Sequence, residues 1–578
     1  MKLVSVCVGR TQNLRIRDQN VTTAFLKGPV EGPVRVSANG LEGNDVAVHT
    51  DAVYAIAEEH YGHWAEQLGR DVADWPHGFF GENLTIRGLD ESQLHVGDIL
   101  SVGDEVRLSV AGPRIPCFKL CWRLNQPDTF IREFGLSGKS GAYFNVDRPG
   151  TIQAGDPVRI VSSANDSFRI GTIAEYALGT EPVDPDVLAR VLNLPGLSQT
   201  SALLLRNKLY HKLDHQRTLE RRWQGWRKFS VAQLHEEVPG VKSFVLKAVD
   251  RRPIAPYRAG QFITLKLPID DGEPLIRVWS ISDYQEDPAS YRVTVKNEPH
   301  SRGGSRFMHE KVTVGSCLDL KPPMGRFVLD RSSFKPVLLI AGGIGITPIL
   351  AMLKAHLDRV GTIPPVYLVH CCRNRAVQPF RATLDRLQEQ HGIKVLHVYS
   401  RPDSHDRPGV DYQVRGHLSI AHLAAFMEGC HILHGGKRVD MPWFESDIYL
   451  CGPAAFQEDL RARLIEAGSN ADRIFSESFD AGRSRAKQEL LDQAEVIFST
   501  ANKSVTWHAE SGKSLLELAE IAGLQPTNAC RMGVCQSCSA KLVEGSVHYQ
   551  HRITSAPANG NILICSAVPA SPRVVVAL

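Results

Sequence analysis

The sequence has no marked excess of charge of either sign. Its 66 Lys and Arg residues stand against 63 Asp and Glu residues, so the formal net charge is only +3 over 578 residues. Such a balance gives no overall field for a nucleic acid or a membrane surface. The opening stretch MKLVSVCVGR has too short an apolar run for a secretory leader and is more typical of a first strand. The chain also has no internal repeat and no low-complexity tract.

A long uncharged run occurs at 336–353, PVLLIAGGIGITPILAML, where 18 residues carry no charge. That is the length at which a membrane span has to be considered. The run contains three glycines in four positions and an internal Pro348. The pattern therefore favours a buried strand at 337–341, a glycine turn and the start of a helix. We expect neither a nucleic-acid partner nor a membrane.

The twelve cysteines do not indicate a disulfide framework, because no secretory leader accompanies them. We expect the reducing cytoplasm as the compartment. Cys530, Cys535 and Cys538 follow the spacing C-x4-C-x2-C, and Cys565 comes after 26 intervening residues. This is the plant-type [2Fe–2S] spacing, whereas zinc ribbons prefer paired C-x2-C knuckles. The four thiolates are predicted to be the metal ligands of a [2Fe–2S] cluster.

The length predicts about four domains at roughly 150 residues each. With 43% hydrophobic and 22% charged residues the composition is that of an ordinary globular protein. The expected fold class is multidomain α+β and α/β, because the secondary-structure pattern changes along the chain. The segments are a β-rich part at 1–163, three helices at 164–225, strands at 226–331, alternating strands and helices at 332–480, a linker at 481–492, and strands with a short helix at 493–578.

The stretch RVWSIS at 277–282 resembles the R-x-Y-S motif of ferredoxin-reductase-like flavin barrels. The resemblance implies that Arg277 holds the flavin phosphate and that Ser280 bonds the flavin edge near N5. Trp279 stands where the motif has tyrosine and would lie against the isoalloxazine or the ribityl chain. A phosphate cradle of backbone N–H groups at a helix start is expected at Gly303, Gly304 and Ser305.

The stretch LLIAGGIGITPIL at 338–350 is not G-x-G-x-x-G, so a generic Rossmann dehydrogenase is not indicated. It resembles the nicotinamide domain of ferredoxin reductases. The resemblance places the pyrophosphate on Gly343, Gly345 and Thr347.

A second stretch of the same domain, YLCGPAAF at 449–456, is the matching late strand end. There Cys451 would stand beside the nicotinamide, with Gly452 and Pro453 opening space for it. The alternative for Cys451 is a buried strand thiol. Glu477 is a further candidate for the lining of the hydride-transfer site.

The order of flavin barrel, nicotinamide domain and C-terminal β-grasp ferredoxin resembles the phthalate dioxygenase reductase family over 226–578. The resemblance implies a hydride from NADH to the flavin and single electrons from the flavin to the cluster. FMN is the flavin that this order implies, with FAD open. NADPH stays open beside NADH, because Ser400 and Arg401 are suited either to a 2′-phosphate or to the surface.

The N-terminal segment contains the stretches FFGENLTIRGL (79–89), VGDILSVG (96–103), PRIPCFKL (113–120) and GAYFNVDRPGTIQAGDPV (141–158). These stretches resemble the MOSC family, and the resemblance implies a β-rich barrel followed by a small three-helix domain. Members bind, or are predicted to bind, molybdenum cofactor. The resemblance makes Cys117 the protein ligand to molybdenum, a role that suits a soft thiolate.

The surroundings of Cys117 leave two interpretations. Arg114 and Lys119 are expected to favour its thiolate and to hold the pterin phosphate. Alternatively Cys117 is a buried small hydrophobe, the usual state of a free cysteine. Cys121 is expected to be structural. The loop after His49 is shorter than in the family, which leaves any role of His49 open.

The leading hypothesis is a self-contained enzyme that passes electrons from NAD(P)H through flavin and [2Fe–2S] to molybdenum. The family resemblance implies an N-hydroxylated small-molecule substrate. In a second hypothesis the cluster reduces a separate partner oxygenase and the MOSC part only docks it. In a third the MOSC part carries sulfur or a cofactor, with a persulfide on Cys117.

Overall fold

The computed structural model describes residues 1–17, 19–45, 52–268, 274–298, 303–359, 363–434, 437–479, 491–528, 531, 533, 536–550, 553, 557 and 560–578. Most of the expected linker, His49, Cys530 and Cys535 lie outside the described residues. The chain divides into two compact units. Unit 1 is Met1–Leu213, Ser332–Lys335 and Glu428–Glu445, and unit 2 is Asp214–Arg331, Pro336–Met427 and Ser446–Leu578.

Unit 1 is built on an eight-stranded sheet with the order β13-β9-β10-β11-β7-β8-β1-β4. Its strands pair in antiparallel fashion, apart from β7 with β8, which are parallel. The strands are β1 (Lys2–Val8), β4 (Gly28–Pro29), β7 (Val53–Ala57), β8 (Leu84–Arg87), β9 (Ile99–Val102), β10 (Val106–Pro113), β11 (Ala142–Arg148) and β13 (Val158–Ser162). In β10 the residues from Val106 to Val110 alternate between buried and half-buried, as a strand covered on one face requires.

Smaller strand groups complete unit 1. They are β2 (Gln12–Ile16) with β3 (Gln19–Thr23), β5 (Val34–Ser37) with β6 (Gly40–Leu41) and β12 (Gly150–Ile152), and β24 (His431–His434) with β25 (Lys437–Asp440). The last pair lies within the segment 332–480 expected for alternating strands and helices, yet it groups with unit 1.

The helices of unit 1 pack on the sheet and on an aromatic cluster that includes Trp64, Phe80 and Phe134. They are α1 (Glu59–Gln67), α2 (Phe118–Leu124), α3 (Phe130–Leu136), α4 (Ile170–Leu178), α5 (Pro185–Leu192) and α6 (Gln199–Leu219), whose last residues belong to unit 2. Asp184 caps α5 through the Asp186 N–H, and Pro185 takes the first helical position.

Unit 2 begins with a six-stranded antiparallel sheet in the order β17-β16-β19-β14-β15-β18. Its elements are β14 (Arg227–Val238), β15 (Val241–Ala248), β16 (Phe262–Leu267), β17 (Leu275–Ser280), β18 (Tyr291–Lys296), α7 (Gly304–Glu310) and β19 (Cys317–Met324). Buried residues of this sheet and of the next one form a single core cluster.

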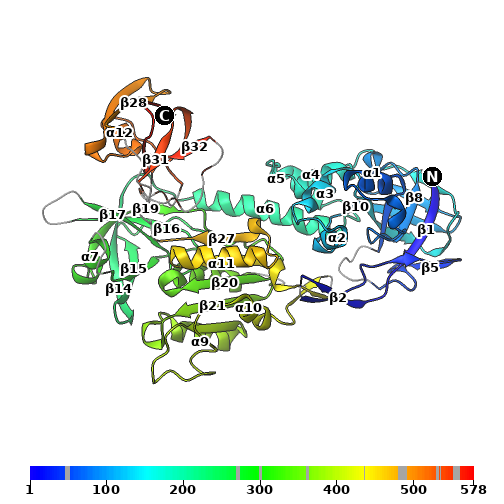
Figure 1. Ribbon diagram of the computed structural model, residues 1–578, viewed down its shortest axis with the longest axis horizontal. Helices are drawn as coiled ribbons and strands as arrows, with labels where there is room; N and C mark the ends of the chain where they lie inside the picture. The colour runs from blue at the N-terminus through cyan, green and yellow to red at the C-terminus, as the bar shows by residue number, and fades with distance from the viewer. Residues whose placement is uncertain are drawn as a thin grey trace. The chain divides into compact units, whose positions relative to one another are not determined.

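A parallel sheet follows, with the order β23-β22-β21-β20-β26-β27, and is green to yellow in Figure 1. Its strands are β20 (Val337–Gly342), β21 (Val366–Cys372), β22 (Lys394–Tyr399), β23 (Val414–Arg415), β26 (Asp447–Cys451) and β27 (Ile474–Glu477). Its helices are α8 (Ile346–Leu357), α9 (Arg381–His391), α10 (Ile420–Phe426) and α11 (Ala454–Glu466). The uncharged run at 336–353 therefore forms β20, a turn and the first part of α8.

The C-terminal part of unit 2 is a five-stranded sheet in the order β29-β28-β34-β30-β32. It comprises β28 (Gln493–Phe498), β29 (Lys503–His508), α12 (Leu515–Ile521), β30 (Ser539–Glu544), β32 (Asn561–Leu563) and β34 (Arg573–Ala577), with β31 (Val547–Tyr549) and β33 (Ala567–Pro569) as a separate pair. Ser514 and Glu517 form a capping box at the start of α12. The chain is thus a mixed α/β multidomain protein.

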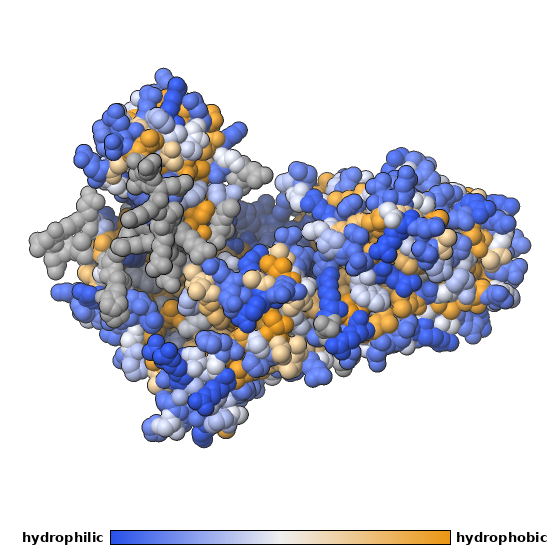
Figure 2. Space-filling view, in the orientation of Figure 1, coloured by the Kyte–Doolittle hydropathy of each residue, from blue (hydrophilic) through white to orange (hydrophobic). Residues whose placement is uncertain are grey.

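Hydrophilic residues predominate on the face of the molecule that Figure 2 shows. Among the described helices, none combines the length and the apolar character that crossing a membrane requires.

Candidate functional site

Cys117 lies between the end of β10 and the start of α2, in extended backbone at φ −136°. It is a free cysteine and is half-buried. Cys121, one turn further along α2, is fully buried, and burial raises the pKa of its thiol to about 12. The two thiols of this helix are therefore unlike: Cys121 is an enclosed thiol, while Cys117 is only partly covered.

Arg114 is a buried cation with unmet hydrogen-bonding capacity. Its side chain is only 2% exposed, and neither Nε nor Nη1 has a hydrogen-bond partner among the described residues. The guanidinium carbon lies 5.2 Å from the ring centre of Tyr54 and 5.8 Å from that of Phe134. Since a guanidinium keeps its charge in a protein, these two N–H groups are positioned for an anionic acceptor.

Lys119 is a second buried cation, also 2% exposed. Burial lowers its pKa, whereas the Cys117 thiol and the carboxylates of Glu445 and Asp440 act in the opposite direction. Its amine nitrogen lies 5.8 Å from the ring centre of Phe118. Arg114 and Lys119 both interact electrostatically with Cys117, so the expected trio is brought together.

Sequence reasoning missed a third cation, Lys27, whose Nζ donates to Asn83 Oδ1 at 2.8 Å. Burial, together with the nearby Arg114, lowers the pKa of Lys27 to about 7, although Glu82 acts in the opposite direction. The Glu82 carboxylate already accepts the Gly78 N–H at 2.7 Å and the Thr85 hydroxyl at 3.0 Å. The GENLT motif therefore supplies a satisfied structural carboxylate and an amide that holds Lys27. A lone lysine in the apolar run AFLKG was the available signal.

The described half of the iron–sulfur motif is compact. Cys538 and Cys565 are both buried in the core of the C-terminal sheet, and the Ile564 N–H donates to the Cys538 carbonyl at 3.4 Å. The Gly533 N–H donates to Cys565 Sγ at 3.2 Å. Such N–H···S bonds stabilise a thiolate that ligates iron. These residues fit a cluster ligated on one side by Cys538 and Cys565.

The flavin motif forms a cradle that a side chain would fill. Arg277 lies on β17, and α7 begins at Gly304 after Gly303 at φ +88°. A Cβ at Gly304 would stand 2.7 Å from Arg277 Cγ. Arg277 and the glycine pair are therefore side by side, as a joint phosphate site requires. Ser305 Oγ accepts the Glu298 N–H at 3.1 Å.

Trp279 and Ser280 follow Arg277 on the same strand. In the register of β16 with β17, Trp279 pairs with Ile263, and Ser280 pairs with Phe262. Trp279 is half-buried and Ser280 is buried.

The nicotinamide motifs meet at the carboxyl end of the parallel sheet, where ligands bind in such folds. Ala341 of β20 pairs with Cys451 of β26, and a Cβ at Gly345 would stand 2.8 Å from the Gly452 nitrogen. Only glycine at 345 permits this approach.

The other nicotinamide-site candidates lie at the same edge. Gly343 starts the turn at φ +56°, and the Thr347 hydroxyl donates to the Ile344 carbonyl at 3.1 Å. Pro453 is the residue before α11. Cys451 is 0% exposed, and burial together with Glu477, its partner on β27, raises its pKa. It is therefore a neutral thiol suited to packing.

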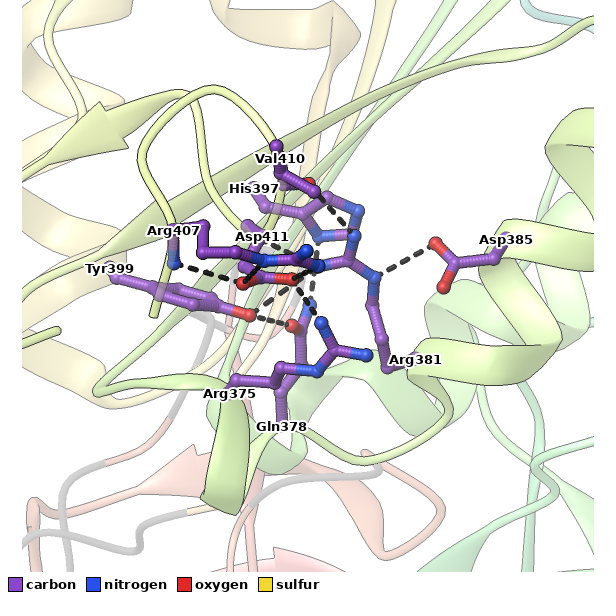
Figure 3. A network of polar contacts seen from close by, with 9 residues as sticks. All are labelled: Arg375, Gln378, Arg381, Asp385, His397, Tyr399, Arg407, Val410 and Asp411. Carbon is purple, nitrogen blue, oxygen red and sulfur yellow. Dashed lines mark hydrogen bonds and ion pairs between the residues drawn. The ribbon is translucent and has the colours of Figure 1, made fainter. Parts of the chain in front are cut away.

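A further polar network lies in the same part, after β21 and β22 (Figure 3). Arg375 and Arg407 both contact the carboxylate of buried Asp411, and these ion pairs hold its pKa below the usual range. The Gln378 amide donates to His397 Nδ1 at 2.8 Å and accepts from the Tyr399 hydroxyl at 2.5 Å. The sequence did not indicate this network, because its members are spread over the chain: Arg375 and Asp411, which form an ion pair, are 36 residues apart.

Ser400 and Arg401 come directly after β22. Their N–H groups donate to the carbonyls of Cys372 and Arg373 at 2.9 and 2.8 Å. The side chains of Arg373 and Arg401 are exposed beside the strand ends. This arrangement leaves both dinucleotides open, as the sequence did.

Three parts of the chain match known protein families. Family models match the MOSC domain at residues 42–159, the oxidoreductase NAD-binding domain at 339–462 and the 2Fe-2S iron-sulfur cluster binding domain at 499–570. The glycine betaine monooxygenase reductase subunit of Chromohalobacter salexigens is 30% identical over 355 residues, which are 58% of this chain and 91% of that protein. The chain belongs to the [2Fe–2S] flavin/NAD reductases.

This reductase carries a MOSC domain in addition, so the fusion expected from the sequence is confirmed. It is an oxidoreductase with NAD-binding and [2Fe–2S] domains. Flavohemoprotein A of Dictyostelium discoideum is 33% identical over 44% of the reductase and 61% of its own length, so the chain spans about three fifths of such relatives. A solved structure of phthalate dioxygenase reductase is 23% identical with a TM-score of 0.43, covering 61% of this chain and 98% of that one.

Proposed function

We propose that the chain is a self-contained oxidoreductase that carries electrons from NAD(P)H through flavin and the [2Fe–2S] cluster to a molybdenum cofactor in its MOSC domain. There an N-hydroxylated small molecule is reduced. The observation that carries this proposal is the pair of buried cations beside Cys117, of which Arg114 has two unmet N–H donors. Buried charges in proteins are normally paired, so an anionic ligand is the missing partner.

The residues present fit the cofactor. The Cys117 thiolate would be the soft ligand to the metal, while Arg114 and Lys119 would hold the pterin phosphate by charge-assisted bonds. Lys27, fixed by Asn83, adds positive charge in the same unit. When bound, the molybdenum cofactor supplies the chemistry of oxygen-atom removal.

The reductase part uses its own residues in matching ways. Arg277 and the glycine pair at 303–304 would hold the flavin phosphate, which suits FMN and leaves FAD open. The turn at 343–345 would receive the pyrophosphate of the dinucleotide. Cys451, neutral and enclosed, would pack beside the nicotinamide and exclude water from hydride transfer. Electrons would then leave singly through the cluster held by four cysteines.

The finer architecture belongs to the same proposal. Residues 1–163 would form the MOSC barrel, 164–225 a three-helix domain, 226–331 the flavin barrel, 332–480 the NAD-binding domain, 481–492 a linker and 493–578 a β-grasp ferredoxin. The alternating burial of the strands and the single parallel sheet support these assignments.

A second candidate function is suggested by a similar protein. A monooxygenase reductase subunit is 30% identical to this chain. In that reading the cluster reduces a separate oxygenase in the cytoplasm, and the MOSC domain docks it or carries sulfur on Cys117.

The test is the Cys117→Ser variant of the full chain, with Cys121→Ser as the matched control on the same helix. Molybdenum per chain, NADH-driven reduction of benzamidoxime or 6-hydroxylaminopurine, and NADH-driven cytochrome c reduction are measured. We expect Cys117→Ser to lose reduction of the N-hydroxylated compound by orders of magnitude and to keep cytochrome c reduction, because serine oxygen is a harder and poorer ligand.

Cys121→Ser should keep both activities in its folded fraction, since its hydroxyl only adds a buried polar group at a cost of about 1–3 kcal/mol. Substrate turnover by Cys117→Ser at the wild-type rate would show that Cys117 is no ligand. A wild-type protein without molybdenum would instead favour the second candidate function.

A further inference from the structure

The connection between α10 and β26 is longer than the parallel sheet requires. Helix α10 ends at Phe426 and β26 begins at Asp447, so twenty residues (427–446) join them. Connections between a helix and the next strand of an α/β fold commonly take about 2–6 residues. The extra length forms β24 and β25, which pair from His431 with Asp440 inward, and a short turn of helix at Trp443–Glu445.

This segment belongs to the same compact unit as the MOSC part. Residues 428–445 group with unit 1, although both chain ends continue into unit 2 at Met427 and Ser446. Phe444 is only 1% exposed, and its ring lies 5.9 Å from that of Phe118 in an edge-to-face arrangement. Phe118 is the residue directly after Cys117 and the first of α2.

A second contact reaches the same ring from the N-terminal hairpin. The Arg17 guanidinium carbon lies 5.2 Å from the Phe444 ring centre, and Arg17 is held by Asp128 through an Nη1–Oδ2 bond of 3.0 Å. Phe444 is therefore enclosed by residues from two different elements of the MOSC part. A large aromatic side chain buried in this way supplies most of the energy of a small interface.

The segment also contributes charge. Glu445 forms an ion pair with Lys335, a residue of the other short stretch that groups with unit 1.

We propose that residues 428–434 and 437–445, although they lie between α10 and β26 in the sequence, form a docking hairpin that packs within unit 1 on the helix that begins at Cys117. Phe444 is its anchor, and the ion pair of Glu445 with Lys335 fixes the end of the hairpin. The docking surface itself does not depend on molybdenum. Its consequence for coupled turnover rests on the proposed function.

The test uses the full chain and three hairpin variants: Phe444→Ala, Glu445→Gln and, as the matched control, Leu433→Ala. Leu433 lies on the same hairpin but is 57% exposed, so its truncation removes no packing. Hydrogen exchange of the peptide 117–124 is followed by mass spectrometry. We expect Phe444→Ala to speed exchange there about tenfold, as the loss of an aromatic contact allows, and Leu433→Ala to leave it unchanged.

The activity readout separates docking from folding. Phe444→Ala should keep NADH-driven cytochrome c reduction within about twofold and lower NADH-driven reduction of the N-hydroxylated compound at least about tenfold. Glu445→Gln, which preserves volume, should weaken coupled turnover less than Phe444→Ala and make it less sensitive to salt, because the charge contact that salt screens is gone.

Unchanged exchange of peptide 117–124 in Phe444→Ala would overturn the docking hairpin. If exchange rises as expected but the wild type holds no molybdenum, the hairpin stands and the proposed function fails. Should Phe444→Ala not fold, Phe444→Leu replaces it, with a smaller rise in exchange expected and no rise counting against the proposal.

Discussion

Replacing Arg114 with methionine is expected to move two properties in opposite directions. The substitution keeps an unbranched side chain of similar length but removes the charge and all the N–H donors. In the structure this guanidinium is 2% exposed, with Nε and Nη1 unmet and two aromatic rings within 6 Å. Arg114 therefore destabilises the folded protein when no ligand is bound and stabilises it when an anionic ligand is bound.

The magnitudes decide the sign in each state. Each unmet buried donor costs about 1–3 kcal/mol, and each cation–π contact returns about 0.5–2 kcal/mol. With central values, two of each leave a net cost of about 1–2 kcal/mol, which methionine would relieve. With a phosphate bound, two charge-assisted bonds at about 1.5–3 kcal/mol each are lost. That loss of about 3–6 kcal/mol corresponds to about 100- to 10,000-fold weaker cofactor binding.

The assay measures thermal unfolding of protein stripped of cofactor and molybdenum per chain in protein as purified. Arg107→Met is the matched control, because Arg107 lies on β10, the strand that ends just before Arg114, is half-buried and donates from Nη1 to the Val106 carbonyl at 3.1 Å. Arg114→Met should unfold at an equal or higher temperature than the wild type and hold little molybdenum. Arg107→Met should keep its molybdenum and should not unfold at a higher temperature than the wild type. A lower unfolding temperature with full molybdenum would refute the reasoning and make Arg114 a packing residue.

Two further predictions concern Lys27 and the cluster. The pKa of Lys27 is about 7 in the folded chain and 10.5 ordinarily. The unfolded chain therefore binds this proton more tightly, and the free energy of unfolding should rise between pH 7 and 10.5. In urea unfolding Lys27→Met should lack that rise, and the variant should also hold less molybdenum than the wild type. Cys565→Ser should abolish cytochrome c reduction and leave NADH–ferricyanide reduction largely intact, because ferricyanide takes electrons from the flavin; equal loss of both, with flavin retained, would contradict the order of carriers.

The elements that sequence predicted well are those in which one short stretch contains the whole signal. The run at 336–353 formed a strand, a turn and a helix start because glycines and a proline punctuate an otherwise continuous apolar segment. Arg277 and Gly304, each part of its own motif, lie side by side although 27 residues separate them, and their role at a flavin phosphate stays a prediction. Cys530 and Cys535 stay predictions, since they lie outside the described residues.

What sequence missed depends on long-range pairing. Lys27 has no motif of its own, and its meaning comes from Asn83, 56 residues away. The docking hairpin was assigned to the α/β segment because its local pattern is only that of two short strands. Neither its grouping with unit 1 nor the contact of Phe444 with Phe118 has a signal in the local sequence. Periodicity reports local structure and burial, not the partner.

The two predicted anion sites are built on opposite principles, and the difference bears on stability. The flavin cradle relies on backbone N–H groups and on Arg277 beside Gly304, an arrangement that needs no buried charge. The MOSC site instead encloses Arg114 and Lys119 and keeps Lys27 at a lowered pKa. An anion that binds the folded state but not the unfolded state stabilises a protein with such cations. The stabilisation grows with the ratio of the ligand concentration to Kd. The MOSC part should therefore be the part of the chain whose stability depends most strongly on its cofactor.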